Sequence, residues 1–150
     1  MKTAYRVLAH SIMILVILQT MVIVWGFFGL FHWIEDGGVM NKAVLDDRDT
    51  LNFTEQRGMM LHGIGGMVLV PLVVLAFLIV SFFAKIPGGV AAAGIVVGLV
   101  VAQVALGIFA HGVPGLGILH ALGAFLIIGA ANAADRRAKR VSAPVEVAAR

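Results

Sequence analysis

Long stretches without charged residues constrain this chain more than any other feature of its sequence. Residues 7–34, 58–84 and 86–134 contain no Asp, Glu, Lys or Arg. A helix needs about 20 consecutive apolar residues to cross the hydrocarbon core of a bilayer, and the last stretch has room for two such helices. The Gly and Pro residues of 112–115 mark a tight reversal within that stretch. The sequence therefore predicts four membrane-spanning helices.

We expect an all-α, four-helix transmembrane bundle with helices at about 7–34, 58–84, 88–111 and 115–134. A polar loop, 35–57, joins the first two helices, and a basic tail, 135–150, follows the domain formed by 1–134. The composition agrees, because 61% of the residues are hydrophobic and 13% are charged. Soluble domains average about 45–50% apolar and about 25% charged residues.

The basic residues are divided unequally between the two ends of the predicted helices. Loops on the cytoplasmic side of a membrane are enriched in Lys and Arg. One side carries eight basic residues and the other only three, next to six acidic residues of the 35–57 loop. The richer set is Lys2, Arg6, Lys85, Arg136, Arg137, Lys139, Arg140 and Arg150. We therefore expect both termini to face the cytoplasm in a multi-pass protein of the cytoplasmic membrane.

Charge and cysteine content exclude several classes of function. The net charge is +3, and most of the basic residues lie on the predicted cytoplasmic side, where they would meet an anionic inner leaflet. We therefore expect the lipid bilayer as a partner and no nucleic acid. The chain has no cysteine, which excludes disulfides, thiolate metal sites and a covalently attached c-type haem.

Two histidines occupy matching places within the predicted spans. His62 begins the sequence HGIG and His120 begins HALG, each near the start of an inward-running helix. At 1.5 Å per residue they lie about 6 Å and about 7.5 Å below the outer helix ends. Each preceding outward helix carries one glutamine, Gln19 or Gln103. The pattern predicts two pseudo-repeated hairpins related by an axis along the membrane normal, which would place the histidines at one depth.

Opposed imidazoles at one depth are suited to the axial coordination of a haem iron. His62 and His120 are the predicted ligands, and the glycines on the same helix faces, Gly65, Gly66 and Gly123, would leave room for a flat ring. Arg57 is the predicted propionate partner, with Arg48 as the weaker candidate. Without a thioether link, the group would be haem b.

Other interpretations of the polar residues remain open at this stage. His, Gln and small residues also pack membrane helices together. We expect Gln19 and Gln103 to bond across helices, and Gly89, Gly94, Gly98 and Gly107 to form a close-packing surface. His32 and His111 could join the deep pair in an outer copper or zinc site, relay protons or contact a partner. His10 is predicted to be interfacial.

The segments VAQVALGI, 101–108, and GILHALG, 117–123, resemble the four-helix repeat of haem A synthases. In that family a Gln-x-x-x-Gly motif on the third helix precedes a haem-ligating histidine on the fourth, and His62 occupies the place of the matching histidine on the second. The whole layout is also similar to a family of small four-helix bacterial membrane proteins. The resemblance implies haem binding, and a homodimer would restore the eight helices of the synthases.

The predicted function is that of a b-type haem-binding membrane protein which transfers electrons near the outer face. A redox or oxidase-assembly protein would then be its partner. Two alternatives remain: a membrane subunit or assembly factor without a cofactor, and an oxidoreductase that acts on haem or quinol.

Overall fold

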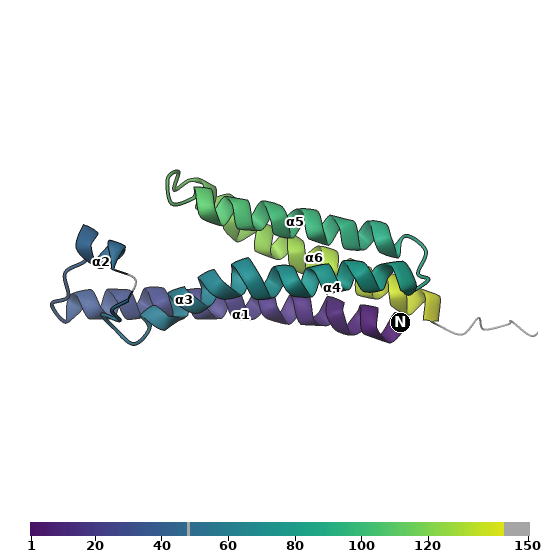
Figure 1. Cartoon of the computed structure of the whole chain (residues 1–150), viewed down its shortest axis with the longest axis horizontal. Helices are drawn as coiled ribbons and strands as arrows, with labels where there is room; N and C mark the ends of the chain where they lie inside the picture. The colour runs from purple at the N-terminus through teal and green to yellow at the C-terminus, as the bar shows by residue number, and fades with distance from the viewer. Residues whose placement is uncertain (48, 143–150) are drawn as a thin grey trace, which may run out of the picture. The chain divides into compact units, whose positions relative to one another are not determined.

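The computed structural model describes residues 1–47 and 49–142, and within these residues every regular element is helical. The all-α prediction is therefore confirmed for this part of the chain. The elements are α1 (Lys2–Glu35), α2 (Lys42–Asp46), α3 (Gln56–Ile64), a π-helical turn η1 (Gly65–Leu69), α4 (Val70–Phe83), α5 (Gly89–Phe109) and α6 (Leu116–Ser142) (Figure 1).

Within the described residues, four helical segments are long and apolar enough to cross a membrane, as predicted: Lys2–Glu35, Gln56–Phe83, Gly89–Phe109 and Leu116–Val141. Many of their large apolar side chains are exposed, including Phe28 at 72% and Ile118 at 74%. Exposed apolar surface on this scale is rare on a monomer in water and is expected where lipid is the solvent. The described part of the chain is therefore all-helical, and its four apolar helices are those of a multi-pass membrane protein by length and composition.

The chain divides into two compact units, which we describe separately. Unit 1 comprises 1–16 and the described residues from Val70 onward, so it contains the first half of α1 together with α4, α5 and α6. Unit 2 comprises Ile17–Leu69, with the second half of α1, α2, α3 and η1.

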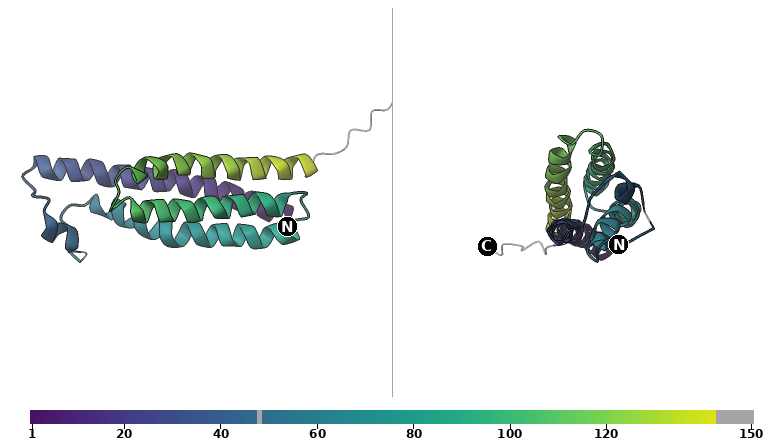
Figure 2. Two further views of the ribbon diagram at one scale, coloured as in Figure 1. Left: turned by 90° about the horizontal axis from the view of Figure 1, so that it is seen from above. Right: turned by 90° about the vertical axis from the view of Figure 1, so that its left-hand side faces the viewer.

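Unit 1 contains the buried core of the described chain. Tyr5, Ala9, Ile12 and Val16 recur at helical spacing on α1 and are all buried. The side chain of Tyr5 packs on Phe77, with ring centroids 4.5 Å apart, and its hydroxyl donates to the carbonyl of Gly89 at 3.1 Å. Helices α4, α5 and α6 run side by side (Figure 2).

The connections within unit 1 follow the sequence signals. Helix α5 ends at Phe109 and α6 begins at Leu116, so the predicted reversal at 112–115 is confirmed. Gly88 precedes α5 with φ +68°, a conformation that side chains disfavour, and a Cβ there would lie 2.6 Å from Nη1 of Arg137. That guanidinium donates to the carbonyl of Pro87 at 3.2 Å and so connects the turn to α6.

Helix α6 extends beyond its predicted end at residue 134 and continues through Ser142. Ala134, Asp135 and Ala138 are buried against unit 1, so this segment packs as part of the bundle and does not form a free tail. The remaining predicted tail, 143–150, and Arg48 lie outside the described residues.

The predicted close-packing surface on α5 is only partly present. A Cβ added at Gly94 or Gly98 would meet no described atom within 4 Å, so these two glycines face open space and the prediction is wrong for them. Gly89 lies against Ile86, and Gly107 lies against the ring of His120.

In unit 2, the close approach of helices depends on glycines of α1 and α3. A Cβ at Gly58 would overlap the carbonyl of Val22 on α1, and one at Gly29 would overlap the side chain of Glu55. Near the helix ends, Trp33 stacks on Phe53 with centroids 5.5 Å apart. In the loop, hydrogen bonds from Thr50 and from the backbone N–H of Asp49 hold the pKa of the Asp47 carboxyl below its ordinary value.

Candidate functional site

His62 lies on α3 in unit 2, one turn before the π-helical segment. Its Nδ1 atom is 3.0 Å from the backbone carbonyl oxygen of Gln19 on α1. A carbonyl oxygen only accepts hydrogen bonds, so Nδ1 must carry the proton and donate. In the neutral ring, Nε2 is then the nitrogen that holds the lone pair.

His120 lies on α6 in unit 1 and has the same arrangement. Its Nδ1 atom is 2.9 Å from the backbone carbonyl oxygen of Gln103 on α5. The side-chain amide of Gln103 returns a hydrogen bond from Nε2 to the carbonyl of His120 at 2.7 Å. The prediction that this glutamine bonds across helices is confirmed, and the pair fixes the His120 ring against α5.

The glycines of the two His-x-x-Gly motifs lie against glutamine side chains. A Cβ at Gly65 would overlap Nε2 of Gln19, and one at Gly123 would overlap Oε1 of Gln103. Gly66 would bring a Cβ to 3.8 Å from Oε1 of Gln19, an ordinary contact. The room predicted for a flat ring at Gly65 and Gly123 is therefore taken by the amides in this structure, because each glutamine extends across to the facing helix.

Both glutamines also carry a buried acceptor that receives no hydrogen bond from the described residues, Oε1 of Gln19 and Oε1 of Gln103. Buried polar atoms are nearly always paired, so such atoms call for an explanation. At Gln103 the oxygen lies next to Gly123, where the Cα–H group offers a weak donor.

The structure thus forms two local clusters, His62 with Gln19 and Gly65 in unit 2, and His120 with Gln103 and Gly123 in unit 1. Arg57, the predicted propionate partner, is exposed near the start of α3 in unit 2. Arg48, the weaker candidate, is outside the described residues.

The more superficial histidines are placed differently from the deep pair. The His32 side chain is 72% exposed, with Nε2 3.7 Å from the Asp36 carboxylate. His111 is exposed in the turn after α5, and its Nδ1 bonds to the carbonyl of Gly107 near the end of that helix at 3.0 Å. Within the described residues, no group of three or more His, Asp or Glu side chains is arranged to hold a metal ion. The predicted outer copper or zinc site therefore has no support.

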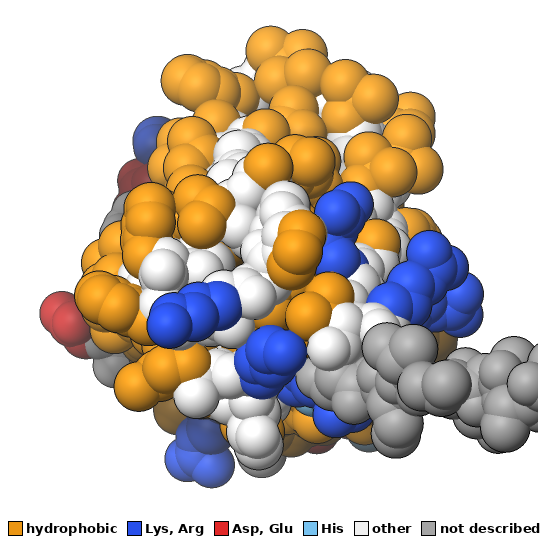
Figure 3. Space-filling view, turned by 90° about the vertical axis from the view of Figure 1, so that its right-hand side faces the viewer, with side chains coloured by type: hydrophobic (Ala, Val, Ile, Leu, Met, Phe, Trp, Pro, Cys, Tyr) orange, Lys and Arg blue, Asp and Glu red, His pale blue; other side chains and the backbone are white. Residues whose placement is uncertain are grey.

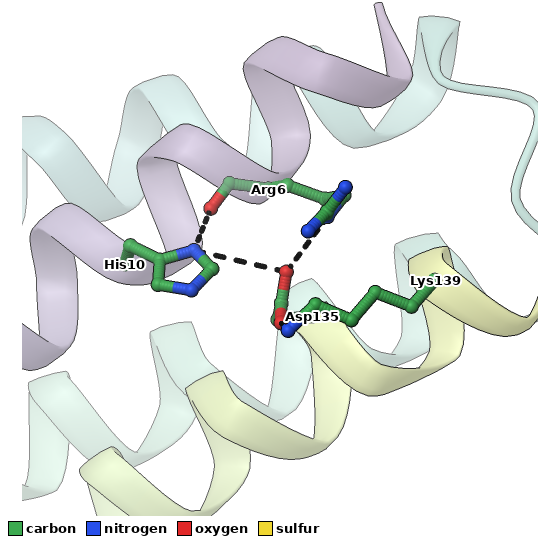
Figure 4. Close-up of polar contacts among 4 residues, drawn as sticks. All are labelled: Arg6, His10, Asp135 and Lys139. Atoms are coloured by element: carbon green, nitrogen blue, oxygen red, sulfur yellow. Dashed lines mark hydrogen bonds and ion pairs between the residues drawn. The ribbon is translucent and has the colours of Figure 1, made fainter. Parts of the chain in front are cut away.

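Sequence reasoning missed a charge cluster around the buried carboxylate of Asp135 in unit 1 (Figure 4). The Asp135 side chain is 1% exposed, and it accepts from Nε of Arg6 at 3.0 Å and from Nζ of Lys139 at 2.7 Å. Nδ1 of His10 lies 3.7 Å from the same carboxylate. The i,i+4 spacings of Arg6 with His10 and of Asp135 with Lys139 are the sequence signals for this cluster. Asp135 is the first residue of the predicted tail, so the prediction does not include it in the bundle.

Comparison with known proteins adds nothing to this geometry, since no family model, no curated protein and no solved structure matches the chain. The fold and the sites define a class of protein: the part of the chain that the structure describes is all-helical, with four membrane-length helices and two histidine–glutamine clusters.

Proposed function

We propose that this protein binds b-type haem through His62 and His120 and transfers electrons near the outer face of the cytoplasmic membrane. The observation that carries the proposal is the matching hydrogen bond that each ring makes within its own cluster. In each, Nδ1 donates to a backbone carbonyl of the neighbouring helix, at 3.0 Å and 2.9 Å.

This hydrogen bond is the one that metal-ligating histidines usually make. The carbonyl that accepts from Nδ1 fixes the tautomer and the orientation of the ring, and it raises the basicity of Nε2. Nε2 of both rings would then be the atom that coordinates iron, so the chemistry of the two side chains suits a bis-histidine haem. Arg57, exposed near the start of the His62 helix, is the proposed partner of a propionate. Bound haem would supply a one-electron ferric–ferrous couple.

We further propose that α1–α3 and α5–α6 contain repeats of one hairpin, and that both termini face the cytoplasm. The matched contacts of the two clusters support the repeat, because each joins a glutamine carbonyl to a histidine ring and a glutamine amide to the glycine three residues later. The unequal charge of the two sides supports the orientation.

One observation favours a different function, a membrane subunit without a cofactor. The side-chain amides of Gln19 and Gln103 occupy the space that a side chain at position 65 or 123 would need. Such contacts between polar and small residues hold membrane helices together. In that case both histidines would serve only to hold neighbouring helices together.

An absorption spectrum separates these two functions. The full-length protein, expressed with added haem and purified in detergent, is expected to show a low-spin Soret band and a sharp α-band on reduction. His62→Ala and His120→Ala are each expected to lose the low-spin spectrum, because each removes one axial ligand.

His111→Ala is the matched control, since His111 is exposed and its Nδ1 bonds to the adjoining end of α5, at Gly107 and Ile108. It is expected to keep the wild-type spectrum. Colourless wild-type protein, or a spectrum that survives both deep substitutions, would overturn the proposal and favour the packing function.

A further inference from the structure

One face of the first half of α1, in unit 1, forms a groove of ≈ 420 Å³ that combines polar and apolar side chains. It is lined by Thr3, Arg6, Val7, His10, Ser11 and Ile14, residues that recur every three or four positions. Val7 and Ile14 are 56% and 57% exposed, so this face is open to the surrounding medium, which for a membrane helix is lipid.

The ion-pair cluster to which Arg6 belongs carries a net positive charge. The single negative charge of Asp135 pairs with two cations, Arg6 and Lys139, and Arg6 is the one that lines the groove. Arg6 uses only Nε for this pair at 3.0 Å, and its side chain is 39% exposed. The terminal amino groups of its guanidinium therefore remain as donors along the groove.

Lys and Arg side chains are also spread over the end of unit 1 at which α1 begins (Figure 3). The groove therefore lies in a field that attracts anions. The Asp135 carboxylate holds Arg6 in place and prevents its side chain from extending freely into water.

The polar groups descend along the helix in an order that fits an amphiphile. Arg6 and Thr3 lie nearest the helix start; at 1.5 Å per residue His10 lies about one turn, roughly 6 Å, beyond Arg6, and Ser11 about two turns, roughly 12 Å, beyond Thr3. Val7 and Ile14 supply apolar surface along the same face. Along the helix, the cationic and hydroxyl donors of Arg6 and Thr3 therefore come first, and the polar side chains of His10 and Ser11 follow.

We propose that this groove binds one anionic phospholipid of the adjacent leaflet. Arg6 and Thr3 donate to its phosphate, Ser11 and His10 contact its ester groups, and an acyl chain lies along Val7 and Ile14. The site is independent of haem, because none of its residues belongs to the two histidine–glutamine clusters.

Native mass spectrometry of the full-length protein tests the site, with phosphatidylglycerol and phosphatidylcholine of identical acyl chains as probes. The wild type is expected to retain phosphatidylglycerol in preference to phosphatidylcholine. The double variant Arg6→Gln/Asp135→Asn removes one positive and one negative charge, so the net charge is unchanged and no buried charge is left alone. Because it removes the guanidinium donors, it is expected to bind phosphatidylglycerol about fivefold more weakly.

Arg140→Gln is the matched control, because Arg140 is a basic residue at the same end that does not line the groove. It is expected to retain the preference. The variant Thr3→Val/Ser11→Ala keeps every ion pair of Asp135 and is expected to weaken the binding of both lipids about threefold. It therefore tests the site even where the charge variant does not fold.

Three results would overturn the proposal. Equal retention of the two lipids by the wild type would remove the evidence for charge selection. An equal loss in Arg140→Gln and in the double variant would indicate a diffuse field and no site. Displacement of the lipid by inorganic phosphate alone would show that the headgroup chemistry, without the acyl chain, accounts for binding.

Discussion

The contacts of the two glutamines explain why the third residue after His62 and after His120 is a glycine. The amide of Gln103 lies where a side chain at 123 would project, and its Nε2 donates to His120 at 2.7 Å. A methyl group at 123 must displace that amide and weaken the bond.

Gly123→Ala is therefore expected to lower the free energy of unfolding by about 1–2 kcal/mol, as a lost hydrogen bond and local overpacking together imply. Gly129→Ala, on the same helix with nothing within 4 Å of its Cβ position, is the control. It is expected to be neutral or to raise stability by up to about 1 kcal/mol through helix propensity. Titration with SDS measures both, and equal effects would contradict the contact.

Burial distinguishes two otherwise similar Asp–Lys pairs. Asp135 and Lys139 are separated by four residues at 2.7 Å, as are Lys42 and Asp46 at 2.9 Å, but Asp135 is 1% exposed and Asp46 64%. Asp135→Ala is expected to cost about 1–3 kcal/mol, since it also breaks the bond to Arg6. Asp46→Ala is expected to cost less than about 0.5 kcal/mol. The same SDS titration compares them, and an equal cost would argue against a structural role for Asp135.

At the scale of elements, helix type and order were predictable from the sequence, and helix ends and contacts were not. The stretches without charged residues predict four membrane-spanning helices, because charged side chains are costly in the hydrocarbon core. The i,i+4 spacing of Asp135 and Lys139 is a local signal that α6 continues past Asp135, whereas the contact of Asp135 with Arg6, a residue far away along the chain, has no local signal. The matched histidines and glutamines were predicted as candidates. Their mutual bonds depend on how each helix is rotated about its axis, which a short motif leaves undetermined.

The crossing of α1 and α3 in unit 2 is tested by two glycines on one helix. A Cβ at Gly58 would overlap the backbone carbonyl of Val22, which moves only if a helix moves, whereas Gly63 has nothing within 4 Å. Gly58→Ala is expected to lower the free energy of unfolding by about 1–3 kcal/mol. Gly63→Ala is expected to have little effect in the same titration. Tolerance of alanine at both positions would show that the helices do not approach so closely.

At the scale of the whole molecule, the orientation in the membrane is open to direct labelling because the chain has no cysteine. Asp46→Cys in the predicted outer loop is expected to react with a membrane-impermeant maleimide on intact cells. Arg136→Cys at the other side is expected to react only after permeabilisation. The reverse pattern would place both termini outside and would invert the proposed depth of the histidines.

The central claim is that His62 and His120 both coordinate one iron. Near-infrared magnetic circular dichroism of the ferric full-length protein tests this claim most directly, because the energy of the porphyrin-to-iron charge-transfer band reports the axial ligands. The account predicts a low-spin band characteristic of two neutral imidazoles, lost in His62→Ala and in His120→Ala and kept in His111→Ala. A high-spin band, a band of other ligation, or protein that takes up no haem would contradict it.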